Sequence, residues 1–333
     1  MQRQGISRSA SDYAIYDPSD ISAPRLVGRV LARGLSDESA DRHYLVLDDV
    51  NGRGHYVDIG RGDETEPIAE GSIVSVNAKP LGPRQVDRTI ADIAAAHDGR
   101  YSVDIHLHHD RSATQAFAES HVRRLEAMRR QGKFAEREPD GTWVVSADHV
   151  ERAAAFEQAR SSPVVVETLS TLPIDRQVTA DGATWLDREL VADAPTPLRD
   201  TGFGREAREA LVRRQQWLIE QGLAEREQDQ IVYRANILSL LRRRELNRVA
   251  GQLSDELKLS YAEHKSGQKV EGVYRHRIDL ASGRFAVIEK SREFTLVPWR
   301  PALERGLGKP VIGIGRGDAI SWTVGRKRGP SIS

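Results

Sequence analysis

One pattern occurs twice in this chain: an arginine-rich amphipathic helix, a glycine that ends it, and a short β-hairpin. The later copy reads GFGREAREALVRRQQWLIEQGLAEREQDQIVY, from Gly202 to Tyr233. At 100° per residue its apolar side chains fall in one sector, which predicts a helix buried along one side. Gly222 ends the helix, because glycine takes the left-handed conformation at little steric cost. Alternating residues on both sides of Gln228-Asp229-Gln230 then predict a hairpin.

The earlier copy has the same order of elements and a similar amino-acid sequence. Val122-Arg123-Arg124 leads to Gln131-Gly132, as Val212-Arg213-Arg214 leads to Gln221-Gly222. A turn at Pro139-Asp140-Gly141 then separates two short strands. A helix followed directly by a hairpin is the order of the third helix and wing of a winged helix-turn-helix unit. Because two copies are too few for a solenoid, we predict two related winged modules.

Composition excludes several classes of protein. The chain has 333 residues, no cysteine, and 49 basic against 49 acidic side chains. Disulfides, thiolate catalysis and cysteine-based metal sites are therefore excluded. No apolar run is long enough to cross a membrane, and the N-terminal residues lack the apolar core of a secretory signal. We expect a cytoplasmic protein with no membrane insertion and no cofactor.

The order of patterns predicts an α+β fold with several domains. Short strands between Arg25 and Pro80, with an Asn51-Gly52 turn, favour a small β-barrel. A strand is expected from Tyr101 to His108, a long helix from Ala235 to Leu257, and strands again after Tyr261. The predicted division is a disordered lead-in (1–23), a small β-barrel (24–82), a first winged-helix-like module (83–160), a second (163–258), a C-terminal β domain (261–325) and a basic tail (326–333).

Arginines on the two predicted helices are the main candidates for contact with nucleic acid. On the helical projection Arg214 points into the apolar sector, as Arg124 does in the earlier copy, so we expect both either to snorkel towards solvent or to pair with a carboxylate inside the fold. The arginines outside that sector can reach phosphates or base edges. Interspersed Glu206, Glu209 and Glu220 leave open a solvated face with no ligand. The predicted DNA-binding residues are Arg205, Arg208, Arg213, Arg123, Arg129, Arg326, Lys327 and Arg328.

A histidine-rich segment gives a weaker alternative. On the strand expected from Tyr101 to His108, His106 and His108 would point to the same face, as metal ligands do. A metal site would need a third ligand, and a nicking enzyme would need a tyrosine held nearby. His109 would lie on the opposite face, and Tyr101 on the same short strand. A solvated strand face therefore accounts better for these residues, and no metal site is predicted.

Several long sequence segments resemble segments of one protein family. They are GATWLDRELV at Gly182–Val191, QGLAERE in the second copy, LLRRREL at Leu240–Leu246, LASGRFAVIEKSREFTLVPWRPALER at Leu280–Arg305 and the closing ISWTVGRKRGPS. Together with RLVGRVLARGLSDE and HYVDIGRGD near the N-terminus, they resemble the C-terminal region of alphaproteobacterial conjugative relaxases, mobilisation nucleases of the Ti-plasmid type. The resemblance runs from about Arg25 to the C-terminus.

The resemblance implies a protein without the nicking chemistry. Relaxases of this type carry their catalytic tyrosine and metal-binding histidines in a separate N-terminal domain, which has no counterpart here, so no catalytic residue is carried over. We therefore expect a non-catalytic accessory region that binds transfer-origin DNA, relaxosome proteins or the type IV secretion coupling protein. A protein-interaction adaptor without DNA binding is the first alternative, and a metal-dependent nuclease that uses His106 and His108 is the second. The DNA site, the oligomeric state and the choice between a truncated relaxase and a stand-alone protein are not determined by the sequence.

Overall fold

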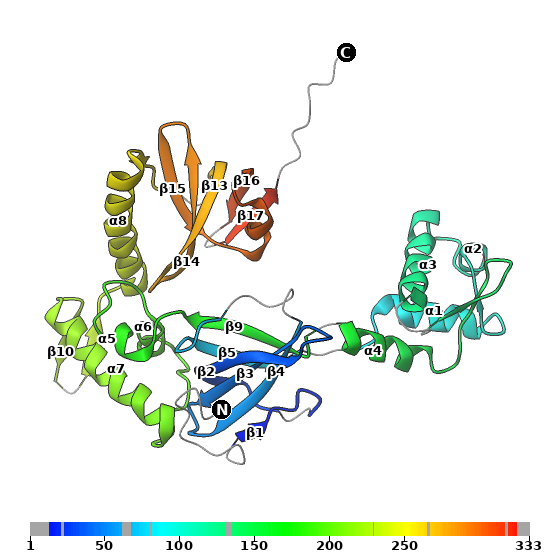
Figure 1. Ribbon diagram of the computed structural model, residues 1–333, viewed down its shortest axis with the longest axis horizontal. Coiled ribbons are helices and arrows are strands. Elements are labelled where there is room, and N and C mark those ends of the chain that lie inside the picture. The colour runs from blue at the N-terminus through cyan, green and yellow to red at the C-terminus, as the bar shows by residue number, and fades with distance from the viewer. Residues whose placement is uncertain are drawn as a thin grey trace.

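The computed structural model describes residues 13–20, 23–61, 68–79, 82–130, 135–160, 162–228, 230–264, 267–316 and 319–324. Figure 1 shows an N-terminal sheet at the centre, a helical unit set apart on one side, and a second sheet beside a long helix. Eight α-helices and several sheets make up the described residues, so the predicted α+β class is confirmed.

The N-terminal sheet has six strands. They are β1 (Tyr13–Ile15), β2 (Leu26–Asp37), β3 (Arg42–Asp49), β4 (Gly54–Arg61), β5 (Ile73–Ala78) and β9 (Val164–Ser170), in the order β1-β4-β3-β2-β5-β9. The predicted Asn51-Gly52 hairpin is confirmed: Gly52 has φ +76° between antiparallel β3 and β4. Leucine, isoleucine and valine side chains of these strands form one apolar core.

The predicted β-barrel is wrong, because the described strands form no closed barrel. β1 pairs in parallel with β4 at one end of the sheet, and β9 pairs antiparallel with β5 at the other. The sheet curls enough that a Cβ built on Gly60 of β4 would lie 2.7 Å from the Cα of Ser162, just before β9. Since β9 comes from a distant part of the chain, local strand patterns did not reveal how the sheet ends.

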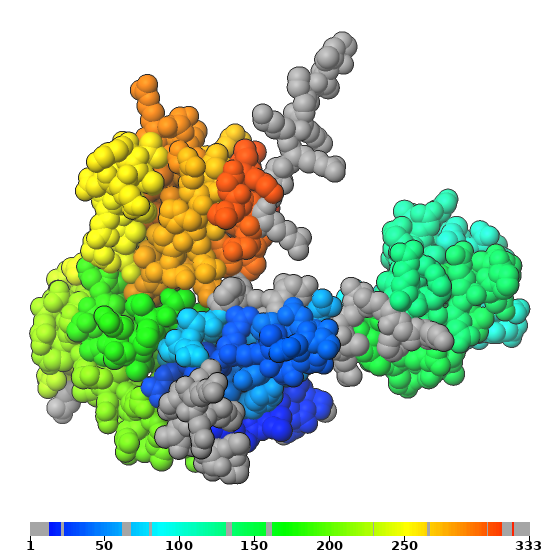
Figure 2. All heavy atoms as spheres, viewed as in Figure 1, coloured from blue at the N-terminus to red at the C-terminus, as the bar shows by residue number. Residues whose placement is uncertain are grey.

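The first helical unit lies in the chain between β5 and β9. It contains α1 (Gln85–Ala95), β6 (Arg100–Tyr101), α2 (Val103–His109), α3 (Gln115–Arg130), β7 (Glu136–Arg137), β8 (Trp143–Val144) and α4 (His149–Arg160). Its three short strands pair in the order β6-β8-β7, beside a core formed by the helices. Figure 2 shows this unit as a separate lobe.

The strand predicted from Tyr101 to His108 is also wrong. Only Arg100 and Tyr101 are in a strand, and a helix begins at Val103. Ser102 is the N-cap of that helix, and its hydroxyl accepts a hydrogen bond from the Ile105 amide at 3.1 Å. A serine N-cap satisfies a backbone donor that would otherwise be free, so it starts the helix despite the alternating pattern that follows.

The second helical unit confirms the helix, glycine and hairpin order. It contains α5 (Ile174–Val178), α6 (Trp185–Leu190), α7 (Gly202–Glu220), β10 (Ala224–Glu227) and β11 (Gln230–Tyr233). Gly222 has φ +65° directly after α7, and β10 pairs antiparallel with β11. Phe203 and Ala207 of α7 are buried against Trp185 and Val50, while Leu218 lies in a second cluster beneath the hairpin.

The last part of the chain is a long helix and a second six-stranded sheet. α8 (Ile237–Leu257) packs Val249 and Leu253 against Val287 and Phe294. The sheet has the order β12-β15-β14-β13-β16-β17. Its other elements are β12 (Ser260–Tyr261), β13 (Lys269–Leu280), β14 (Gly283–Lys290), β15 (Glu293–Pro298), the 3-10 helix η3 (Pro301–Gly306), β16 (Pro310–Arg316) and β17 (Ala319–Val324).

Candidate functional site

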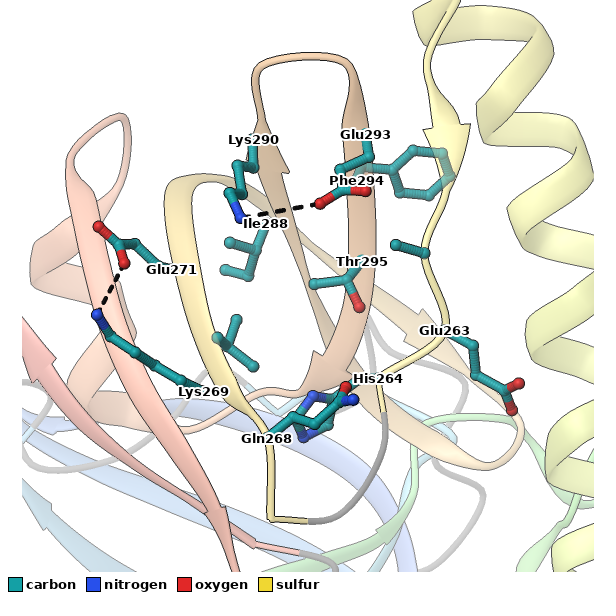
Figure 3. Close-up of a pocket in the computed structure, with 12 residues that line it drawn as sticks. Glu263, His264, Gln268, Lys269, Glu271, Ile288, Lys290, Glu293, Phe294 and Thr295 are labelled. Carbon is teal, nitrogen blue, oxygen red and sulfur yellow. Dashed lines mark hydrogen bonds and ion pairs between the residues drawn. The ribbon is translucent and has the colours of Figure 1, made fainter.

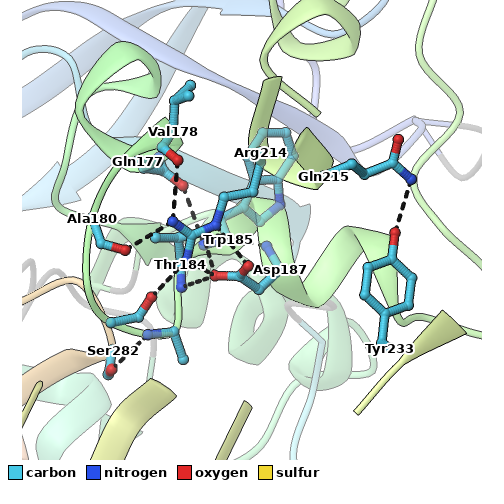
Figure 4. A network of polar contacts seen from close by, with 12 residues as sticks. Gln177, Val178, Ala180, Thr184, Trp185, Asp187, Arg214, Gln215, Tyr233 and Ser282 are labelled. Carbon is cyan, nitrogen blue, oxygen red and sulfur yellow. Dashed lines mark hydrogen bonds and ion pairs between the residues drawn. The ribbon is translucent and has the colours of Figure 1, made fainter. Parts of the chain in front are cut away.

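Arg214 and Arg124 point into the fold, as predicted, with side chains that are 0% and 9% exposed. Arg214 of α7 is 0% exposed, and its Nε and Nη2 donate to the two carboxylate oxygens of Asp187 at 2.8 Å each. The same guanidinium donates to the carbonyls of Val178, Ala180 and Gly182 (Figure 4). These acceptors use all the N–H donors of the guanidinium, so Arg214 has no donor left for a ligand.

Arg124 of α3 has the equivalent position in the first unit. Its guanidinium donates to both carboxylate oxygens of Asp87 at 2.9 and 3.0 Å, and to Glu157 at 2.6 Å. Burial lowers the pKa of Arg124, but the hydrogen bonds that it donates to Asp87 and Glu157 outweigh this effect and raise the pKa above its ordinary value. Burial raises the pKa of Glu157, and its hydrogen bonds with Arg84 and Arg124 outweigh that effect and lower it. This arginine is therefore a permanent internal cation.

The outward arginines of α7 are exposed, as predicted. Among the described residues no carboxylate lies within ion-pair distance of Arg205 or Arg213, although Glu209 is also exposed on this helix. Glu206, in contrast, is paired with Arg29 of β2 at 2.7 Å. Within the described residues α7 therefore exposes two arginines that have no ion-pair partner, and the carboxylates of Glu209 and Glu220 are exposed on the same helix.

Arg208 differs from its two neighbours. Its guanidinium is half exposed, donates to the Leu198 carbonyl, and lies 3.8 Å from Asp200. Part of its hydrogen-bonding capacity is therefore used within the protein, which makes Arg208 a weaker candidate for phosphate contact than Arg205 and Arg213.

The predicted arginines of α3 are exposed but paired. Arg123 lies 3.9 Å from Glu119, and Arg129 lies 2.8 Å from Glu126, which also pairs with Arg130. Hydrogen bonds from Arg129 and then Arg130 lower the pKa of Glu126 to about 2. The first unit therefore presents less unpaired positive charge than α7. The three basic residues of the tail, Arg326, Lys327 and Arg328, lie outside the described residues.

His106 and His108 are not brought together as metal ligands. They are on helix α2 rather than a strand, with His106 1% exposed and His108 on the surface. The buried Tyr101 hydroxyl and His106 Nδ1 share a hydrogen bond of 2.5 Å, and the His106 ring packs edge-on against His121. Burial raises the pKa of Tyr101 and lowers that of His106, so both are neutral. Within the described part of the chain no group of three metal-ligating side chains is present.

A small hollow lies at the end of the C-terminal sheet. It has a volume of about 120 Å³, and Ile288 and Phe294 form part of its wall (Figure 3). Its two lysines are each paired with a glutamate, Lys269 with Glu271 at 2.8 Å and Lys290 with Glu293 at 4.0 Å. Glu263 also lines the hollow, so three carboxylates face two ammonium groups and the charge of the rim does not favour an anion.

The buried carboxylate of Glu245 was not predicted from the sequence. It lies at a buried position of α8 between Leu241 and Val249, and its carboxylate accepts from the amides of Ala281 and Ser282 at 2.8 and 2.9 Å. The Ser282 hydroxyl in turn accepts from the Ala183 amide. A glutamate in an apolar stripe was the available signal, since a buried charge requires partners. Glu245 thus joins α8 to the turn between β13 and β14, and Ser282 joins that turn to the second helical unit.

These features define a mixed α+β protein built on two helix–hairpin units, each with a buried arginine and further arginines on the surface. Over residues 1–331 the chain matches the family described as protein of unknown function (DUF3363), and it belongs to that family. No curated protein and no solved structure matched the chain. In the described residues no helix is both long and apolar enough to cross a membrane.

Proposed function

We propose that this chain is a non-catalytic accessory region of a conjugative relaxase that holds transfer-origin DNA during plasmid mobilisation. The resemblance of its phrases to the relaxase C-terminal region supports the biological setting. The observation that carries DNA binding is that Arg205 and Arg213, on the surface of α7, have no ion-pair partner in the part of the chain that the structure describes, whereas Arg214 is fully buried. Such cations release counterions from phosphates when they bind DNA.

The order of elements agrees with two winged-helix modules. In the first unit a helix, a strand, two helices and two strands follow one another, and the first strand pairs with the last. The second unit has the helices and the hairpin without that first strand. In helix-turn-helix proteins the second helix of the motif enters the major groove, and α3 and α7 have that place here.

The test is a salt series of binding to a labelled duplex that contains the transfer origin, measured by fluorescence anisotropy. We expect the affinity to fall steeply with salt, and Arg205→Ala with Arg213→Ala to lower the steepness by about 0.9 per lost phosphate contact. The matched control is Arg100→Ala with Arg275→Ala, which removes two exposed cations that are paired with Glu138 and Glu289. If the wild-type protein binds weakly and independently of salt, this function is wrong.

A second candidate is docking to a protein partner, such as a secretion coupling protein. Val212 is 61% exposed on α7. Val122, at the matching position of α3 in the first unit, is partly buried against the core. The β10–β11 hairpin also exposes Glu225 and Glu227, which would repel a phosphate backbone. If Val212→Asp abolishes binding to a purified coupling protein and leaves DNA affinity unchanged, this candidate is favoured. Loss of DNA affinity in Val212→Asp would favour the first proposal.

A further inference from the structure

The outward face of α8 carries a row of polar residues along one side of the helix. Arg244, Asn247, Arg248 and Gly251 follow the i, i+3, i+4, i+7 spacing of a single helical face, and all four are exposed. The opposite side packs against the C-terminal sheet. Figure 2 shows the surface of α8 at the outer edge of the molecule, uncovered by other elements.

This face has positive charge that no carboxylate of the described residues neutralises through an ion pair. From Arg234 to Ser254 the only acidic residue is Glu245, and it is buried against the turn at Ala281 and Ser282. Among the described residues no carboxylate pairs with Arg243, Arg244 or Arg248. The first exposed carboxylate on this side of the helix is that of Asp255.

Gly251 gives a second, independent observation. A glycine inside a helix is unfavourable relative to alanine, so it usually reflects a close approach of other atoms to the backbone. Such an approach is plain at Gly204, where an added Cβ would lie 2.1 Å from the Val50 carbonyl, and at Gly182, where it would lie 2.5 Å from the Glu245 carboxylate. At Gly251 an added Cβ would meet nothing within 4 Å. Nothing in the fold itself requires a glycine there.

We propose that this face of α8 binds the phosphate backbone of duplex DNA, with the strand passing close to the helix at Gly251. The choice of DNA as the partner rests on the proposed function. Arg244 and Arg248 lie about 6 Å apart along the helix axis. Each strand of duplex DNA has one phosphate per about 3.4 Å of its own axis, so guanidinium groups at this spacing can reach different phosphates of one strand. Guanidinium groups bind phosphate oxygens in a bidentate manner.

The composition of the face favours DNA over an acidic protein. Protein interfaces are centred on aromatic or aliphatic anchors that fill pockets on the partner. None of the large hydrophobic side chains found exposed in the described residues belongs to α8. A face of arginine, asparagine and glycine without an apolar anchor suits a hydrated, repetitive polyanion better.

The experiment compares two kinds of α8 variant on a short fluorescein-labelled DNA duplex across a salt series. For Arg243→Ala, Arg244→Ala and Arg248→Ala together, we expect the slope of log affinity against log salt to become shallower by about 2 to 3, since each lost phosphate contact changes it by about 0.9. The matched control removes three exposed, paired cations elsewhere, Arg100, Lys269 and Arg275. We expect the control to keep the wild-type slope.

Gly251→Gln separates binding from folding. Glutamine is a good helix former, so this variant should unfold at a higher temperature than the wild type. Its side chain would occupy the space where the DNA strand approaches, so the same variant should bind the duplex at least several-fold more weakly. A protein that becomes more stable and binds less tightly cannot have lost binding through misfolding.

The outcomes distinguish this inference from the proposed function. If the wild type binds with a steep salt dependence, and the triple arginine variant and Gly251→Gln bind equally well, then α8 is not a DNA-contacting face, and the role of α7 stands. If the wild type shows no salt-dependent binding, both proposals are wrong. Loss of binding to a purified acidic protein, with the DNA slope unchanged in the triple variant, would assign the face to protein contact and overturn the inference.

Discussion

Arg214 and Asp187 form a two-pronged ion pair in which neither side chain is exposed to solvent. Asp187 is the third residue of α6 and also accepts a hydrogen bond from the Thr184 amide, so it completes a capping box at the start of that helix. Arg124 and Asp87 repeat this relationship in the first unit, where Asp87 is the third residue of α1. The two units therefore share an internal arginine that fastens the long helix to the start of an earlier one.

Breaking the buried Arg214–Asp187 pair should lower the free energy of unfolding of the second unit. Asp187→Ala leaves the Arg214 guanidinium buried without its carboxylate, and removal of one partner of a buried pair costs about 3 to 5 kcal/mol. Urea unfolding followed by tryptophan fluorescence measures the change. Glu220→Ala, on the exposed side of α7, is the control and should unfold close to the wild-type midpoint. An Asp187→Ala protein as stable as the control would contradict this account.

The first unit should lose stability as the pH falls from about 7 to 5. Burial lowers the pKa of His149, and Arg124 adds to this effect, while Asp87 opposes it. Burial likewise lowers the pKa of His106. A histidine with a depressed pKa stabilises the fold above its unfolded pKa of about 6.5, because below it the unfolded chain binds more protons than the folded one.

Hydrogen exchange of the α3 amides against pH tests this prediction. We expect protection at Leu125 and Met128 to fall from pH 7 to pH 5, and His149→Gln to make that fall smaller. His108, which is exposed on α2, supplies the control: His108→Gln should follow the wild type. Protection that is constant across this range would show that the buried histidines do not control stability.

Glu245 should stabilise the contact between α8 and the turn at Ala281 and Ser282 of the C-terminal sheet. Glu245→Ala leaves the amides of Ala281 and Ser282 without their acceptor, at a cost of about 1 to 3 kcal/mol for each buried donor. The expected result is faster hydrogen exchange at both amides and earlier proteolysis near residue 282. Glu256→Ala, an exposed substitution on the same helix, should change neither. Unchanged exchange in Glu245→Ala would mean that the joint depends on apolar packing alone.

Two glycine substitutions should have opposite effects on stability. Gly182→Ala places a Cβ 2.5 Å from the buried Glu245 carboxylate, so it should destabilise the protein. Gly251→Ala meets open space and should stabilise α8 by about 0.5 to 1 kcal/mol. Thermal unfolding of the two variants gives the comparison. The same sign for both would contradict the contacts described around these positions.

Local patterns in the sequence predicted the parts of the fold that local forces determine. The helical projection of α7 placed Arg214 inside and Arg205 and Arg213 outside, because one long amphipathic helix fixes the direction of each side chain. The expected strand at Tyr101–His108 was wrong because a serine N-cap decided the local structure against the alternating pattern. The predicted α+β class needed only the order of such elements.

Long-range pairing was beyond the reach of local patterns. The barrel was wrong because β9, whose apolar run at Val164–Val166 is short, pairs with β5 across the whole first unit. Glu245 was missed for the same reason, since its partners Ala281 and Ser282 lie 36 and 37 residues further along the chain. The surface arginines were identified as candidates, but only the structure showed which of them lack carboxylate partners.

The first unit is an insertion between two strands that pair with each other, β5 and β9. Ala78 at the end of β5 is paired directly with Val164 at the start of β9, and the Lys79 amide donates to the Pro163 carbonyl at 2.9 Å. The chain thus leaves the sheet and re-enters it across one strand spacing, about 4.8 Å. Excising the intervening lobe and closing the gap with a tight turn would leave every other strand in register. A lobe attached in this way can be lost or exchanged without any rearrangement of the sheet that carries it.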